Sequence, residues 1–174
     1  MNFLELHTWG SHLGQLERPD RLILDLDPGP QVAWREVIAA ARLARSAFET
    51  LGLRSFVKNT GGVGLHVVVP LVPERGWAEV FGFARGLAQL MAARRPDLYS
   101  TAMPKAGREG MILLDFWRNG RGHTAVAAFS TRARPRASVS VPLEWDELDA
   151  EIRSDAFTLR TLPKRLAGLR RDPW

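Results

Sequence analysis

The chain has 174 residues, of which 45% are hydrophobic and 25% charged, with a formal net charge of +5 at pH 7 and no cysteine. This composition predicts one globular domain over residues 1–174 and excludes disulfides and thiolate metal sites. The basic excess favours an anionic partner such as nucleic acid, a nucleotide or a membrane surface. Because the N-terminus lacks signal-peptide features and no apolar segment reaches the ~20 residues that span a bilayer, we expect a cytoplasmic protein without a membrane partner.

The hydrophobic pattern predicts alternating strands and helices. In chain order it predicts a strand at 21–27, a helix at 31–51, a strand at 54–58, a glycine-rich turn at 59–64, a strand at 65–71 and a helix at 76–93. Beyond these it predicts a strand at 110–116, a turn at 119–122 into a hairpin partner at 123–129, a basic loop at 130–137, a short helix beginning within 142–148 and another near 163–169. The pattern indicates an α+β fold with a mixed β-sheet core flanked by helices.

Two aspartates interrupt the most strand-like segment, "LILDLDPG" at 22–29. Side chains alternate along a strand, so Asp25 and Asp27 share one face, while Leu22, Leu24 and Leu26 point to the other and can bury against a helix. Two carboxylates ~6.5 Å apart along the backbone can converge on one cation or two. The alternative is a pair of carboxylates at a solvated strand end.

A third carboxylate favours the metal site. Asp115 lies near the end of the apolar strand "MILLDF". Asp25, Asp27 and Asp115 would make an all-oxygen site, which suits Mg²⁺ or Mn²⁺ rather than zinc. Such a site can clamp a polyphosphate for in-line phosphoryl transfer.

The loop "KNTGGVGLH" at 58–66 offers phosphate ligands. The main-chain N–H groups of Gly61, Gly62 and Gly64 can approach an anion closely, and Thr60 and His66 add side-chain donors. It is not a Walker A loop, because no Gly-Lys-Ser/Thr follows. Alone, this segment is more commonly a hairpin turn beside a core histidine. The basic loop with Arg132, Arg134 and Arg136 is alone usually a solvated charge run, and Arg108 is alone equally ambiguous. The conjunction of carboxylates, glycine turn and arginines is what indicates a nucleotide site.

Four stretches carry a family resemblance: "ELHTWGS" (5–11), "RPDRLILDLDPG" (18–29), "FVKNTGGVGLHVVVPL" (56–71) and "ILLDFWRNGRGHTAVAAFSTRARPRASVSVPLEWDEL" (112–148). In order and spacing they resemble the polymerase domain of bacterial DNA ligase D, in the archaeo-eukaryotic primase superfamily. The resemblance implies a primase-like catalytic core and a template-directed nucleotidyltransferase that adds NTP or dNTP to gapped or broken DNA ends in non-homologous end joining. It implies Mn²⁺ or Mg²⁺ as cofactor, and Ku protein and a separate DNA ligase as partners.

The resemblance also implies residue roles. Asp25, Asp27 and Asp115 would be the catalytic metal ligands. The nucleotide-binding residues would be His7, Thr60, Gly61, Gly62, Gly64, His66, Arg108, Arg132 and Arg134.

Two departures from the family pattern motivate a second hypothesis. Val63 replaces a lysine of the glycine turn, and the chain begins near the middle of the usual domain, before which family members carry a segment for template and 5′-phosphate binding. The alternative is therefore a catalytically weak nucleotide- or nucleic-acid-binding module of the same fold. A third hypothesis is a phosphatase with an Asp-x-Asp nucleophile, disfavoured because no acidic pair accompanies Asp115.

Overall fold

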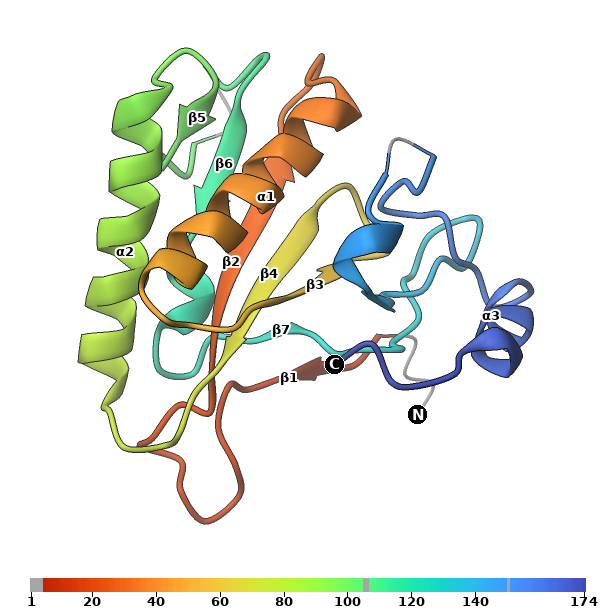
Figure 1. Cartoon of the computed structure of the whole chain (residues 1–174), viewed down its shortest axis with the longest axis horizontal. Coiled ribbons are helices and arrows are strands. Elements are labelled where there is room, and N and C mark those ends of the chain that lie inside the picture. The colour runs from red at the N-terminus through yellow and green to blue at the C-terminus, as the bar shows by residue number, and fades with distance from the viewer. Residues whose placement is uncertain (1–4, 105–106, 150) are drawn as a thin grey trace.

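A six-stranded mixed sheet forms the centre of the molecule (Figure 1). The computed structural model describes residues 5–104, 107–149 and 151–174. In spatial order the sheet consists of β5 (Tyr99–Ser100), β6 (Ile112–Asp115), β2 (Arg21–Pro28), β4 (Leu65–Pro70), β3 (Phe56–Asn59) and β8 (Pro142–Leu143). β5 and β6 are parallel, and the other neighbours are antiparallel. The predicted α+β class with a mixed sheet is confirmed.

Two helices, α1 (Trp34–Thr50) and α2 (Trp77–Arg94), cover one face of this sheet (Figure 1). Leu22, Leu24 and Leu26 of β2 are at most 2% exposed and belong to the core that the sheet forms with these helices. Their alternation with the aspartates decides which face of β2 the helices bury. No helix in the described part of the chain is long and apolar enough to cross a membrane.

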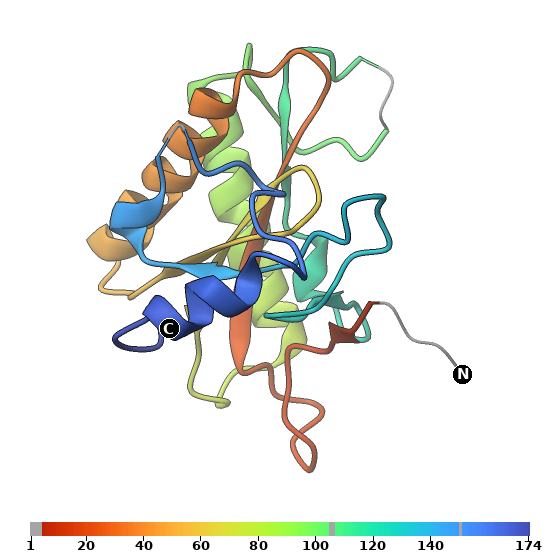
Figure 2. The same ribbon diagram turned by 90° about the vertical axis from the view of Figure 1, so that its right-hand side faces the viewer.

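The opposite face of the sheet carries Ile23, Asp25 and Asp27, as the strand period requires. Over this face lies a short antiparallel pair, β1 (His7–Thr8) with β7 (Ala125–Val126), on the side away from the helices (Figure 2). Beyond β8 the chain forms a short 3₁₀ helix, η2 (Trp145–Glu147), and the helix α3 (Leu162–Gly168). The predicted face of the aspartates is therefore confirmed, and β1 and β7 cover part of it.

One predicted pairing is wrong. Residues 123–129 do not form a hairpin with the strand at 110–116, because the 3₁₀ helix η1 (Trp117–Asn119) redirects the chain and β7 pairs with β1. The buried Asn119 amide holds this turn by bonding both main-chain groups of Ile23 at 2.8 and 2.7 Å. The short helix predicted to begin within 142–148 is present as η2, which starts at Trp145 after Pro142 and Leu143 pair with β3.

Candidate active site

Ionisable side chains form a row across four neighbouring strands. Asp115 of β6 is the register partner of Asp25 on β2, and Asp25 is the partner of His66 on β4. His66 is in turn opposite Lys58 on β3. Directly opposed residues of antiparallel strands share a face, so the row lies on the open face of the sheet, under β1 and β7.

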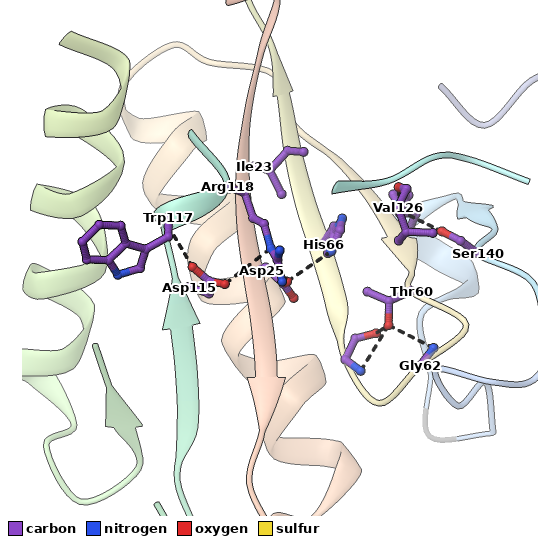
Figure 3. Close-up of polar contacts among 12 residues, drawn as sticks. Ile23, Asp25, Thr60, Gly62, His66, Asp115, Trp117, Arg118, Val126 and Ser140 are labelled. Atoms are coloured by element: carbon purple, nitrogen blue, oxygen red, sulfur yellow. Dashed lines mark hydrogen bonds and ion pairs between the residues drawn. The ribbon is translucent and has the colours of Figure 1, made fainter. Parts of the chain in front are cut away.

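Arg118 of η1 joins the two carboxylates at one end of the row (Figure 3). Its Nε atom lies 3.2 Å from Oδ2 of Asp25 and 3.4 Å from Oδ2 of Asp115. The main-chain N–H of Trp117 donates to the other oxygen of Asp115 at 2.8 Å. The guanidinium is thus the cation that these two buried carboxylates share.

The environment separates the pKa values of the two aspartates. Burial opposes ionisation of Asp25, but His66 and Arg118 outweigh it and lower its pKa to about 2. Burial and the neighbouring charge of Asp25 raise the pKa of Asp115 above its usual value. Burial lowers the pKa of His66 to about 4, so its imidazole is neutral near pH 7. A further cation near Asp115 would therefore favour ionisation of this carboxyl group and lower its pKa.

Asp27 lies on the same face, two residues along β2, opposite Leu113. Within the described residues, however, no three His, Cys, Asp or Glu side chains lie close enough together to hold a metal ion. In this structure the three predicted ligands share a face without converging, with Arg118 between two of them. The donor set still fits a hard divalent cation, since it consists of carboxylate oxygens. The charge of Asp25 disfavours ionisation of Asp115, and a cation between the two carboxylates would relieve this repulsion.

A cavity of about 180 Å³ lies over Asp25 and Asp27, beside the glycine turn. Its lining includes nine of the twelve residues predicted for the site: His7, Asp25, Asp27, Thr60, Gly62, Gly64, His66, Arg132 and Arg134. Val63, Arg118 and Val126 complete it. We call it the carboxylate cavity. It combines acidic groups on its floor with basic groups on its rim.

The hydroxyl of Thr60 holds the turn together. It donates to the carbonyl of Gly64 at 3.0 Å and accepts the N–H of Gly62 at 3.1 Å (Figure 3). Arg132 donates to the carbonyl of Thr60 at 2.6 Å and so connects the basic loop to the turn. A side chain at position 64 would collide with β2, since its Cβ would lie 2.1 Å from the carbonyl oxygen of Leu26. Gly64 is thus a packing requirement of the sheet, while Gly62 faces the arginines.

Glu5 organises the rim of the cavity, a role that the sequence analysis missed. Its carboxylate lies 3.0 Å from Nε2 of His7 and 3.3 Å from Nε of Arg132. It also accepts the main-chain N–H of Ala133 at 2.7 Å. These contacts, that with His7 foremost, lower the pKa of Glu5 to about 2. The only sequence signal was its position two residues before the predicted histidine.

Three predicted residues do not line the cavity. Asp115 contacts Arg118, and the carbonyl of Gly61 accepts a hydrogen bond from the hydroxyl of Ser138. Arg108 is only 6% exposed, and its Nε donates to the carbonyl of Pro104 at 2.9 Å in the loop before β6. The structure therefore does not bring Arg108 to the glycine turn.

Arg118 and Lys58 were not singled out from the sequence. Arg118 follows Asp115 by three residues, but only the 3₁₀ turn brings it back to the carboxylates. Lys58 lies within the predicted strand at 54–58 and is only 2% exposed. The only sequence signal for Lys58 was its position directly after the apolar pair Phe56 and Val57.

Comparison with known proteins adds independent findings. The family model described as LigD, primase-polymerase domain, matches residues 1–174. The chain is similar to the multifunctional non-homologous end joining protein LigD of Pseudomonas aeruginosa, at 43% identity over all of this chain and 21% of that protein. It is 36% identical to LigD of Mycobacterium tuberculosis over 74% of this chain and 17% of that protein.

The fold is also similar to a solved structure. The polymerase domain from Mycobacterium tuberculosis Ligase D, in complex with DNA, superposes with a TM-score of 0.81 at 30% identity, covering 86% of this chain and 52% of that one. The chain therefore spans about a fifth of the length of the curated relatives that it matches, and about half of the solved domain.

Proposed function

Because this chain belongs to the LigD primase-polymerase domain family, we propose that it is the nucleotidyl-transfer core of a DNA-repair polymerase of non-homologous end joining. Its substrates would be NTP or dNTP and the gapped or broken ends of DNA. Ku protein and a DNA ligase would act on the same ends. The observation that carries the proposal is the carboxylate cavity, which gathers residues from the N-terminal strand, β2, the glycine turn and the basic loop.

In the proposed reaction, a 3′-hydroxyl oxygen of the DNA strand attacks the α-phosphorus of the nucleotide. A new P–O bond forms, the bond to the β-phosphate breaks, and pyrophosphate leaves. Divalent cations, Mn²⁺ or Mg²⁺, would neutralise the phosphate charge and polarise the attacking hydroxyl. Asp25, Asp27 and Asp115 are the residues that would hold them.

Arg118 would leave the carboxylates as the cations bind, because it lies against two of the three ligands. The guanidinium is 39% exposed and lines the carboxylate cavity, so it can turn toward solvent or a phosphate without unfolding η1. We therefore assign Arg118 as the internal counter-charge of the metal-free protein.

The triphosphate would lie along the glycine turn. The guanidinium groups of Arg132 and Arg134 provide donors on one side of the cavity, whereas the N–H groups of Gly62 and Gly64 donate to the hydroxyl of Thr60. Arg132 and Arg134 lie close to Gly62, since a Cβ added there would be 3.3 and 3.5 Å from their Nη atoms. The neutral ring of His66 directs Nε2 at Asp25, 3.4 Å from its Oδ2, and so helps to position that carboxylate.

The test is incorporation of labelled NTP and dNTP on gapped DNA, with Mn²⁺, Mg²⁺ or chelator. We expect cation-dependent incorporation that requires the template and is lost in Asp25→Asn. The matched control is Asp172→Asn, an exposed carboxylate near the C-terminus. Incorporation that persists in chelator, or in Asp25→Asn, would refute the proposal.

A further inference from the structure

A second cavity, of about 160 Å³, adjoins the carboxylate cavity. It lies between the open face of the sheet and the segment around β7, and both cavities are lined by Arg118 and Val126. Its walls include Trp9, Arg21, Lys58, His123 and Trp174. We call it the lysine cavity. Among the described residues that line it there is no aspartate or glutamate.

Lys58 is the residue that makes this cavity unusual. Its ammonium group is buried and donates to the carbonyl of Val126 at 2.8 Å and to Oγ of Ser140 at 2.7 Å. Both acceptors are neutral, and the structure shows no carboxylate ion pair for Lys58 among the described residues. A buried charge is costly unless it is paired with an opposite charge. The Lys58 ammonium has only neutral acceptors, so a bound anion would stabilise it.

The other two cations of the lysine cavity already have partners. Arg21 forms an ion pair with Asp20, with Nε 2.5 Å from the carboxylate, and Arg118 contacts Asp25 and Asp115. Their partners lie outside the lining of the lysine cavity. An anion that enters would therefore meet a positive lining whose least compensated charge is Lys58.

We infer that the lysine cavity is a binding site for a phosphate group, with the Lys58 ammonium as its principal ligand. Its volume is below the ~300–1,000 Å³ of sites that enclose whole small molecules, which favours a single phosphate-sized anion. Charge-assisted hydrogen bonds from lysine and arginine are the ordinary means of phosphate binding. The phosphate would be either a phosphodiester of a bound strand or free phosphate or pyrophosphate.

The first test is a titration of the full chain with inorganic phosphate at constant ionic strength, followed by NMR. The readout is the indole N–H signals of Trp9 and Trp174, assigned from the Trp9→Phe and Trp174→Phe variants. We expect both signals to shift and saturate. They should do so equally in Arg134→Ala, which alters only the carboxylate cavity. Equal shifts with sodium chloride at the same ionic strength, or no shifts with phosphate, would overturn the inference.

The second test removes the ligand. Lys58→Met keeps the length of the side chain and removes its charge, and phosphate should then bind at least tenfold more weakly. If the spectrum shows that this variant does not fold, Ala125→Leu decides, because the larger side chain fills the lysine cavity and should abolish the shifts. Unchanged phosphate affinity in whichever variant is folded would contradict the assignment.

The source of the phosphate is distinguished by two further titrations, with a short single-stranded DNA and with pyrophosphate. Shifts with DNA alone assign the site to a strand phosphodiester, and shifts with pyrophosphate alone assign it to a released product. Phosphate binding here does not depend on the proposed function, since the readout is independent of catalysis. Failure of the incorporation assay and failure of this titration are therefore separate outcomes.

Discussion

Asp25 and Asp115 are register partners on the adjacent strands β2 and β6, and the guanidinium of Arg118 lies 3.2 and 3.4 Å from their carboxylates. One guanidinium is therefore shared by both carboxylates in the metal-free protein. A divalent cation would have to replace this arginine rather than enter a vacant carboxylate cluster.

Substituting Asp115→Asn should abolish cation-dependent incorporation while leaving the metal-free protein at least as stable. Burial and Asp25 already raise the pKa of Asp115, so removing its charge relieves repulsion in a buried position. Thermal unfolding should show a stabilisation by Mn²⁺ in the wild type that disappears in this variant. Asp155→Asn, at an exposed surface pair with Arg136, should keep both properties. An undiminished Mn²⁺ stabilisation in Asp115→Asn would exclude Asp115 as a ligand.

Substituting Arg118→Ala should have opposite effects on stability and on metal binding. Without the guanidinium, the free energy of unfolding of the metal-free protein should fall by roughly 1–3 kcal/mol, because two buried carboxylates lose their shared cation. The affinity for Mn²⁺ should rise by about 3–10-fold, because the competitor is gone. Calorimetric titration measures the second effect. The control is Arg121→Ala, whose pair with Glu17 is exposed; equal Mn²⁺ affinities in the wild type and Arg118→Ala would contradict the competition.

The two glycines of the turn should respond differently to alanine. Gly64→Ala should lower the free energy of unfolding by about 3 kcal/mol or more, because its Cβ would meet the carbonyl of Leu26 at 2.1 Å. Gly62→Ala should cost under about 1 kcal/mol, since its nearest contacts, from 3.1 Å, are side-chain atoms of Thr60 and Arg132. It should instead weaken nucleotide binding. Denaturant unfolding with nucleotide titration checks both, and equal stability losses would show that the turn is built differently.

Substituting Val63→Lys should tighten nucleotide binding by ~1–2 kcal/mol, or about 5–30-fold, if a triphosphate lies along the turn. Val63 is 47% exposed and lines the carboxylate cavity, so a lysine there can reach the phosphates. The matched control is Val72→Lys, at an exposed valine outside this cavity. Fluorescence titration with a labelled nucleotide is the measurement. Weaker binding by Val63→Lys than by Val72→Lys would place the triphosphate elsewhere.

The buried Lys58 should make stability depend on alkaline pH. Burial, which outweighs the attraction of Asp25, lowers its pKa to about 7, whereas the unfolded chain keeps the ordinary value of 10.5. Between pH 7 and pH 10.5 the unfolded state binds more protons than the folded state. The contribution of Lys58 to the free energy of unfolding therefore rises with pH over this range and is lost as pH falls through 7. Arg21 and Arg132 lower this pKa further.

Lys58→Met should remove this dependence. The variant should be more stable than the wild type by roughly 2–4 kcal/mol at pH 7, and the difference should shrink toward pH 10. Denaturant unfolding at several pH values in phosphate-free buffer is the measurement. Lys164→Met, on the exposed side of α3, should show no such trend. A difference that is constant with pH would mean that Lys58 keeps an ordinary pKa in the folded protein.

Local sequence patterns determined much of this protein. The alternation of leucine and aspartate over 22–27 was enough to place the carboxylates on one face and the leucines under the helices, because strand side chains have a period of two. The glycine turn and the basic loop were also identified, and the structure brings most of their predicted residues to one cavity. These features depend on neighbours in sequence or on one strand, which a pattern can report.

Tertiary structure decided the rest. The segment 117–129 carries a good hairpin signal, but the amide of Asn119 bonds the main chain of β2 and holds a 3₁₀ turn instead. That turn alone brings Arg118 to Asp25, 93 residues away in sequence. Lys58 likewise acquires its neutral acceptors only when β7 and Ser140 fold over β3. Strand period and turn chemistry act over a few residues, whereas the charge balance of a buried group depends on which distant segments cover it.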